Sequence, residues 1–324
     1  MLRVASSRLR SKLISVCTTL FGISIFVFVV LRVIPGDAIT SSFGQDTSNL
    51  TPQTIKALKS YYGIDKPLLL QYFNWLKGFL TGNLGFAFHT GTPVTTLTAS
   101  SFPVTLELAL FASIIGVTLG TLMGIYSASQ PGGRRDFFGQ IFGLFALAVP
   151  SFVLSTLIVA VSANKFRYFP NGFEYAKPWQ NLSLNLQQMM YPSIVLGIAV
   201  AAPVMRTARS SFIETQEKDF VRTAIGKGVD ERRVRFVHVL RNSLNPIVTM
   251  TGIQFGYLLG GAVIVEQIFS LPGMGRQILD GIMKREYATV QSSVMIVAIS
   301  FVFINLLTDL IYRKVDPRIR QNED

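Results

Sequence analysis

Few residues in this chain have the types and spacing that catalysis, nucleotide binding or metal binding would need. The pair Gly226-Lys227 is the nearest approach to a phosphate-binding loop, which reads G-x-x-x-x-G-K-[ST]. Val221 occupies the place of the first glycine and Gly228 the place of the hydroxyl residue. The two histidines lie far apart, and a zinc site needs three or four converging ligands. We therefore expect no catalytic residue, no metal and no cofactor within this chain.

Three carboxylates, Glu107, Glu266 and Asp309, lie near the ends of long apolar segments. An ionisable group at the centre of a membrane costs about 2.5 to 3.5 kcal/mol, so such residues mark pathways in ion-driven carriers. A position near the segment ends is more typical of an interfacial or paired carboxylate. This counts against a secondary transporter driven by an ion gradient, which stays the alternative from another class.

The elements that must position these residues are apolar helices. The chain has 324 residues, of which 49% are hydrophobic and 15% charged, against about 25% charged in soluble proteins. A membrane core requires about twenty apolar residues per helix. The sequence therefore predicts an all-α, polytopic membrane protein with six transmembrane helices, at residues 13–34, 103–127, 137–163, 184–205, 247–269 and 290–312.

These helices divide the chain into an N-terminus with the first span (1–34), an insertion (35–102), a core (103–312) and a tail (313–324). Lysine and arginine concentrate on the side that holds both termini and a loop at 206–246, so this side is predicted to be cytoplasmic. The net charge of +12 favours membrane lipid, rather than nucleic acid, as a partner. Within the insertion, Thr51-Pro52 predicts the start of one helix, Gly63 its end, and Pro67 the start of another.

The loop at 206–246 is too long for a simple connector and has helical patterning. Four apolar residues with spacing i, i+1, i+4, i+5 gather on one side of a short helix: Phe220, Val221, Ala224 and Ile225. Gly226 and Gly228 then permit a sharp turn, and Asp230 is a plausible N-cap for a second helix. An apolar stripe with basic flanks outside the membrane predicts a docking surface for a partner.

Glycines recur every fourth residue in two predicted spans, which predicts flat strips where helices approach closely, either as static packing or as a sliding contact. The strips are Gly116, Gly120 and Gly124, and Gly252, Gly256 and Gly260. Polar or small residues at membrane depth are candidates for a translocation path. They are Pro150, Ser151, Gln254, Gly256 and Glu266.

The segment Arg222–Gly228 resembles the E-A-A-x-x-x-G sequence in the cytoplasmic loop of bacterial ATP-binding-cassette (ABC) importer permeases, in the peptide-transporter form R-T-A-x-x-K-G. Arg222 and Thr223 replace Glu and Ala, and Arg241 stands where the broader family has a proline. The segments 66–85, 261–276 and 305–320 are similar to the oligopeptide and dipeptide branch, specifically to the first of its two permease subunits. The likeness spans nearly the whole chain.

This resemblance implies a type I ABC importer permease fold with a helical extracytoplasmic insertion, placed in the bacterial inner membrane with both termini cytoplasmic. It implies a heterodimer with a second homologous permease subunit, two cytoplasmic ATPase subunits that bind ATP and Mg, and an extracytoplasmic solute-binding protein. Peptides are the expected cargo, and nickel, glutathione or sugars are the alternatives within the branch. A membrane scaffold without transport is a third hypothesis. The residues assigned to ATPase coupling are Phe220, Val221, Arg222, Thr223, Ala224, Ile225, Lys227 and Gly228.

Overall fold

The computed structural model describes residues 2–33, 51–61, 63, 65–166 and 174–315. Regular structure in these residues is helical, apart from one isolated bridge between Phe86 and Pro93. The chain forms two compact units: Met1–Val104 with Pro272–Val302, and Thr105–Leu271 with Phe303–Asp324. The all-α prediction is therefore confirmed. Parts of the predicted insertion (34–50) and tail (316–324), and the side chain of Asp309, lie outside the described residues.

The first unit contains α1 (Leu2–Val33), α3 (Pro52–Tyr61), α4 (Leu68–Leu80), the start of α5 (Val94–Ala128), α13 (Met274–Met283) and the start of α14 (Tyr287–Val315). The local predictions agree with it. The Thr51 hydroxyl accepts from the Thr54 amide at 3.2 Å, Gly63 has a φ of +64°, and α4 begins directly after Pro67. Val27, Leu31 and Val290 form a buried apolar cluster of this unit.

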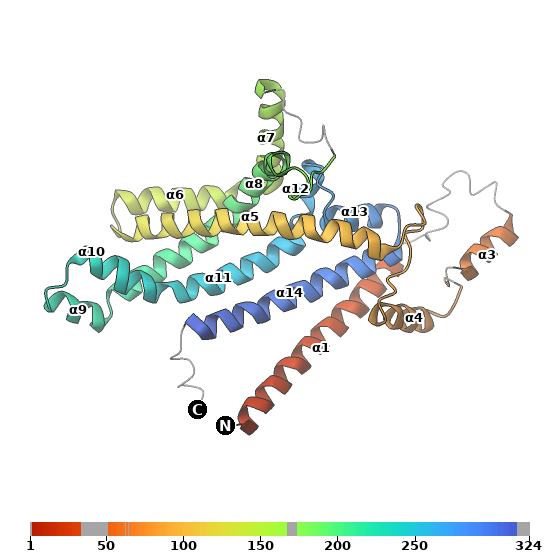
Figure 1. Ribbon diagram of the computed structural model, residues 1–324, viewed down its shortest axis with the longest axis horizontal. Helices are drawn as coiled ribbons and strands as arrows, with labels where there is room; N and C mark the ends of the chain where they lie inside the picture. Colours follow the sequence, from red (N-terminus) through yellow and green to blue (C-terminus); the bar gives the residue numbers. More distant parts are fainter. Residues whose placement is uncertain (1, 34–50, 62, 64, 167–173, 316–324) are drawn as a thin grey trace. The chain divides into compact units, whose positions relative to one another are not determined.

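The second unit is built around one long helix, α8 (Leu182–Gln216). This helix packs against α6 (Arg134–Ala148), α7 (Ser151–Phe166) and α11 (Leu240–Gly261), as can be followed in Figure 1. Three short helices connect α8 to α11, and α12 (Val263–Ile268) follows α11. The short ones are α9 (Asp219–Gly226), α10 (Glu231–Arg233) and the π-helix η2 (Val234–Val239).

The six predicted spans are supported only in part. Among the described residues, four helices are long and apolar enough to cross a membrane: α1, α5, α8 and α14. A fifth span results if the bent pair α6 and α7 counts as one. The prediction of a span at 247–269 gains no such support, because the segment is divided at Ala262 between α11 and α12.

The predicted span over 137–163 is a bent pair of helices rather than one continuous helix. The segment breaks after Ala148, and α6 and α7 meet at 90°. Pro150 has no amide hydrogen to donate, and its ring disfavours a helical conformation in the residue before it. Val149 accordingly has an extended ψ of 113°. Two prolines of α8, Pro192 and Pro203, by contrast lie within a helix that stays continuous.

The first predicted glycine strip is a close contact between α5 and α8. A Cβ atom added to Gly116 would lie 2.6 Å from Val200 Cβ, and one added to Gly120 would lie 2.6 Å from the Ala201 carbonyl oxygen. At Gly124 the nearest atom would be Ala208 Cβ, also at 2.6 Å. Real Cβ atoms are never this close to such neighbours, so only glycine permits the approach.

In the second predicted strip, on α11, the two glycines Gly252 and Gly260 differ. A Cβ atom on Gly252 would clash with Thr308 of α14, whereas one on Gly260 would meet no atom within 4 Å. Gly256 is buried. The four-residue repeat alone therefore does not distinguish a packing glycine from one that faces open space.

Candidate functional site

The loop between α8 and α11 turns at Gly228, as predicted. This residue has a φ of +76°, in the left-handed region that favours glycine, and its amide donates to the Ile225 carbonyl at 2.9 Å. The Val229 amide donates to the Ala224 carbonyl at 3.2 Å, which completes the end of α9. Gly226 is the last helical residue of α9, so the turn itself depends on Gly228.

The helix after this turn starts where the sequence predicts and then changes type. The Asp230 carboxylate accepts from the backbone amides of Arg232 and Arg233 at 3.1 and 3.3 Å, which confirms the N-cap. Within one turn the helix becomes the π-helix η2 and then continues as α11. Short π-helical turns occur frequently at functional sites.

The predicted apolar stripe of α9 divides into an inward and an outward part. Val221 is only 5% exposed and packs in a buried cluster with Ala128, Phe212, Val234 and Val239. Phe220 and Ile225 are 39% and 50% exposed. Adjacent residues of a helix are separated by about 100° of rotation, so Phe220 and Val221 face different surroundings.

The polar residues of the predicted coupling segment are on the surface. Arg222, Thr223 and Lys227 are exposed, and Ala224 is partly buried against the cluster that holds Val221. The Thr223 hydroxyl donates to the Asp219 carbonyl within α9. Arg222 and Asp219 form a loose ion pair at 3.9 Å between side chains that are 76% and 99% exposed. A pair this exposed contributes little stability, so Arg222 is available to a partner.

The predicted path residues come from different helices. Pro150 and Ser151 lie at the α6–α7 bend, where Pro150 is exposed. Gln254, half-buried on α11, lies with its side-chain amide 3.6 Å from the sulfur of Met250. Glu266 is fully buried on α12, a helix that packs against α7 and α8.

Glu266 is held by a residue that sequence analysis did not identify. The Thr105 hydroxyl donates to Glu266 Oε1 at 2.6 Å, and both side chains are 1% exposed or less. The two residues are 161 positions apart, so no local pattern connects them. A buried carboxylate retained beside an apolar helix requires such a hydrogen bond.

A second, partly buried polar group joins the segment before α8 to α5. The Tyr175 hydroxyl donates to Glu107 Oε2 at 2.5 Å, and the Asn185 side-chain amide donates to the Tyr175 oxygen at 3.3 Å. Burial, reinforced by the hydrogen bond to Glu107, raises the pKa of Tyr175 well above its ordinary value. The hydroxyl therefore stays protonated at neutral pH. The prediction that Glu107 is an interfacial or paired carboxylate agrees with this contact.

A third buried group, absent from the sequence-based predictions, joins α6 to α8. Asp136 accepts from Arg209 Nε at 2.6 Å and Arg209 Nη2 at 2.7 Å, a bidentate pair. The Ser127 hydroxyl and the Gly132 amide donate to the same carboxylate at 2.6 and 2.9 Å. An aspartate in the first turn of an apolar helix was the one signal available in the sequence.

No group of three or more His, Cys, Asp or Glu side chains suited to a metal occurs in the described part of the chain. The site thus consists of a projecting helix, α9, and of buried polar groups that fix α8 to its neighbours. None of these arrangements provides a nucleophile with an adjacent base, so they suit movement and contact rather than bond chemistry.

Comparisons with known proteins agree along the whole chain. Residues 116–321 match the family model described as a binding-protein-dependent transport system inner membrane component, and residues 1–109 match the model of its N-terminal part. The chain is 34% identical over 309 residues to a protein named glutathione transport system permease protein GsiC from Pectobacterium atrosepticum, covering 95% of this chain and 97% of that protein. The GsiC protein of Escherichia coli K12 is 33% identical over the same length.

A solved structure supports the fold. The crystal structure of an amino acid ABC transporter with histidines aligns with a TM-score of 0.52 and 17% identity, covering 68% of this chain and 94% of the other.

Proposed function

The chain belongs to the family of binding-protein-dependent transport system inner membrane components and is a permease subunit of an ABC importer, and we propose that α9 couples it to the ATPase subunits of that importer and that its cargo is a short peptide. In this proposal it forms a heterodimer with a second permease, and two cytoplasmic ATPase subunits bind ATP and Mg. A solute-binding protein delivers the cargo from outside, and both termini of this chain are cytoplasmic.

The observation that carries the coupling role is the division of α9 into two faces. Val221 anchors the helix in the core of its own unit, while Phe220 and Ile225 remain exposed. Exposure of large apolar side chains to water is unfavourable, and a cleft on a partner protein would bury those of this basic loop. Arg222 and Lys227 beside them supply directional polar contacts. This arrangement supports an ATPase subunit as the occupant.

The anchor also provides a route for movement. The cluster around Val221 includes Phe212 near the end of α8 and Val239 at the start of α11. A displacement of α9 is therefore passed to both long helices through packed side chains. Closure of two ATPases on ATP would bias the permease between inward-facing and outward-facing states, because each state has its own helix arrangement.

The names of the relatives match the alternative cargo within the branch, which is itself a small peptide. Those reported above are named for glutathione transport, and glutathione is a tripeptide. The test is uptake of a labelled short peptide by the complete complex in proteoliposomes. ATP-dependent uptake that persists after the proton gradient is dissipated supports the proposal. Uptake of glutathione but of no other short peptide would narrow the cargo to that tripeptide, and uptake of nickel alone would contradict the peptide cargo. Uptake that follows the proton gradient at constant ATP would favour a secondary transporter.

The coupling role is tested at the turn. Gly228→Val places a β-branched residue at a φ of +76°, a conformation that costs about 1 to 3 kcal/mol for non-glycine residues. Gly226→Ala is the matched control, because this glycine ends α9 and an added Cβ meets nothing within 4 Å. We expect Gly228→Val to reduce both peptide uptake and stimulated ATP hydrolysis, with Gly226→Ala near wild type. Normal stimulation in Gly228→Val and in a Phe220→Ser, Ile225→Ser double variant would refute the docking role.

A further inference from the structure

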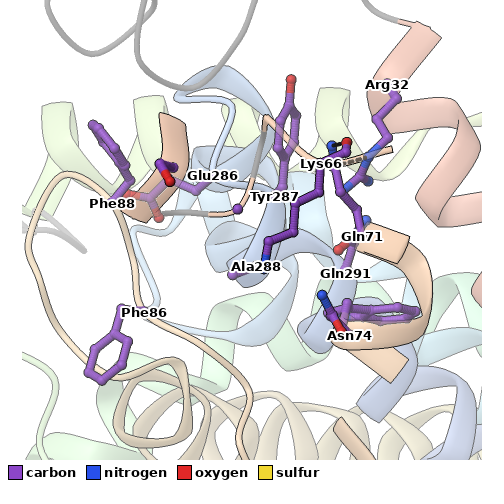
Figure 2. Close-up of a pocket in the computed structure, with 13 residues that line it drawn as sticks. Arg32, Lys66, Gln71, Asn74, Phe86, Phe88, Glu286, Tyr287, Ala288 and Gln291 are labelled. Carbon is purple, nitrogen blue, oxygen red and sulfur yellow. Dashed lines mark hydrogen bonds between the residues drawn. The ribbon is translucent and has the colours of Figure 1, made fainter. Parts of the chain in front are cut away.

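The first unit contains a cavity of about 370 Å³ that the transport role does not use. It is lined by the end of α1, by α4 with the residues before it, and by the start of α14 (Figure 2). Its polar lining includes Arg32, Lys66, Gln71 and Gln291. A volume of this size lies within the range of small-ligand sites, so its chemistry is worth establishing.

Arg32 brings a positive charge whose hydrogen-bond partners in the described part of the chain are neutral. Its Nε and Nη2 donate to the Gln71 side-chain oxygen at 3.2 and 3.1 Å, and its Nη1 donates to the Phe28 carbonyl. The guanidinium carbon lies 3.4 Å from the centre of the Phe28 ring. None of these partners carries a negative charge. Figure 2 shows the Arg32–Gln71 bond at the edge of the cavity.

The carboxylate that lines the cavity is already bound by other groups. Glu286 Oε1 lies 3.1 Å from His89 Nδ1 and accepts from the His89 amide at 3.2 Å, and Oε2 accepts from the Thr289 hydroxyl at 3.0 Å. Lys66 adds a second cation to the lining. The cavity is therefore electropositive.

Two buried donors in the lining have no acceptor. The indole nitrogen of Trp75 and the side-chain nitrogen of Gln291 are buried and make no hydrogen bond in the described part of the chain. Gln291 is only 2% exposed. A buried donor left unpaired is unfavourable, and a ligand oxygen within the cavity would remove that penalty. Two cations against one carboxylate, together with two orphan donors, favour an anion that accepts several hydrogen bonds at once.

We propose that this cavity binds the phosphate of an anionic phospholipid headgroup. The shared chemistry is an oxyanion, and exposed apolar residues on two of the helices that line the cavity favour a lipid as its source. On α1, Val29 and Val33 are 48% and 74% exposed, and on α4 Leu69 and Phe73 are 75% and 60% exposed. These apolar side chains would contact the acyl chains of a lipid, whereas a free phosphate has no apolar part to contact them. Arginine and tryptophan at a membrane surface are typical neighbours of headgroups.

The test measures lipid retained by the full chain in its purified complex. The complex is exchanged into nanodiscs that contain phosphatidylglycerol and phosphatidylcholine, and the retained lipid is counted by native mass spectrometry. We expect preferential retention of phosphatidylglycerol. Gln291→Leu and Arg32→Gln should each weaken that retention about ten- to one-hundredfold, the range for a lost charge-assisted hydrogen bond. Lys66→Gln should weaken it too, whereas Lys77→Gln, on α4 but outside the cavity lining, should not.

Gln291→Leu separates binding from folding, because Arg32→Gln also removes the bonds from α1 to Gln71. In lipid-free detergent, Gln291→Leu should raise the thermal midpoint, since it removes an unpaired buried donor. Wild-type retention in Gln291→Leu, or equal losses in the Lys66 and Lys77 variants, would overturn the proposal. So would binding of inorganic phosphate that depends on Arg32 while no phosphatidylglycerol is retained, because the source would then be a free anion.

Discussion

Removing Arg209 should destabilise the second unit more than removing its partner Asp136. The carboxylate side chain is 3% exposed, whereas the guanidinium side chain is 29% exposed. Arg209→Met leaves a buried carboxylate with neutral donors alone: the Ser127 hydroxyl, the Gly132 amide and the Gln140 side chain. A buried charge that loses its partner costs about 3 to 5 kcal/mol.

Asp136→Leu leaves a different problem, because Arg209 can turn its guanidinium toward water. The remaining penalty is the unpaired Gly132 amide and Ser127 hydroxyl, about 1 to 3 kcal/mol. In the double variant no charge is left buried without a partner, so it should be less destabilised than Arg209→Met alone. The expected interaction free energy between the two positions is about 1 to 3 kcal/mol.

The assay is the free energy of unfolding from chemical denaturation in detergent, followed by circular dichroism. Arg206→Met is the matched control, because Arg206 is exposed on the same helix and should change stability by less than about 0.5 kcal/mol. Equal effects of Arg209→Met and Arg206→Met would refute the reasoning. If the two changes in unfolding free energy, for Asp136→Leu and for Arg209→Met, simply added in the double variant, the reasoning would be refuted as well. The expected non-additivity arises because Arg209→Met leaves the Asp136 charge buried without its partner.

Two further predictions concern the glycine contact between α5 and α8 and the Tyr175 hydroxyl. Gly120→Ala should destabilise the chain by about 1 to 3 kcal/mol, because its Cβ would lie 2.6 Å from a backbone oxygen, whereas Gly260→Ala, with open space, should be neutral or gain up to about 1 kcal/mol in the same unfolding assay. Tyr175→Phe should remove a pH dependence of the unfolding free energy. Because the pKa of Tyr175 is raised in the folded chain, the unfolded chain releases this proton at lower pH. The contribution of Tyr175 to stability is therefore complete below about pH 10 and falls above it. Unfolding free energies measured between about pH 8 and pH 11 in wild type and variant check this, and identical slopes would contradict it.

Sequence reasoning succeeded where the physical cause is local. Pro67 begins α4, Asp230 caps the helix after it, and Gly228 makes the turn, because each outcome depends on the backbone preferences of a few consecutive residues. The bend at Pro150 could not be predicted in the same way. Proline interrupts a helix there and not at Pro192, and the difference depends on which neighbours satisfy the freed carbonyl groups.

Contacts between distant segments account for the remaining differences. Asp136 and Arg209 are 73 positions apart, and the pairing of Thr105 with Glu266 spans 161. Hydrophobic periodicity identifies which residues share a helix face but not which helix lies opposite. Val221 illustrates this, since its spacing matched the exposed Ile225 while its burial depends on Phe212 and Val234 from other helices. The sequence thus predicts which residues form the buried face of a helix, but not which other helix packs against that face.

Whether the glycine strip slides or only packs depends on the ion pair beside it. A four-residue glycine period is about one helical turn, so a shift of α5 along α8 by one turn would place each glycine near the next contact. The strip alone therefore permits both. Asp136 is joined through Ser127 to the end of α5 and through Arg209 to α8, so such a shift would break either the buried Ser127 hydrogen bond or the bidentate ion pair. The penalty is about 1 to 3 kcal/mol in the first case and about 3 to 5 kcal/mol in the second, which favours α5, α6 and α8 moving as one body.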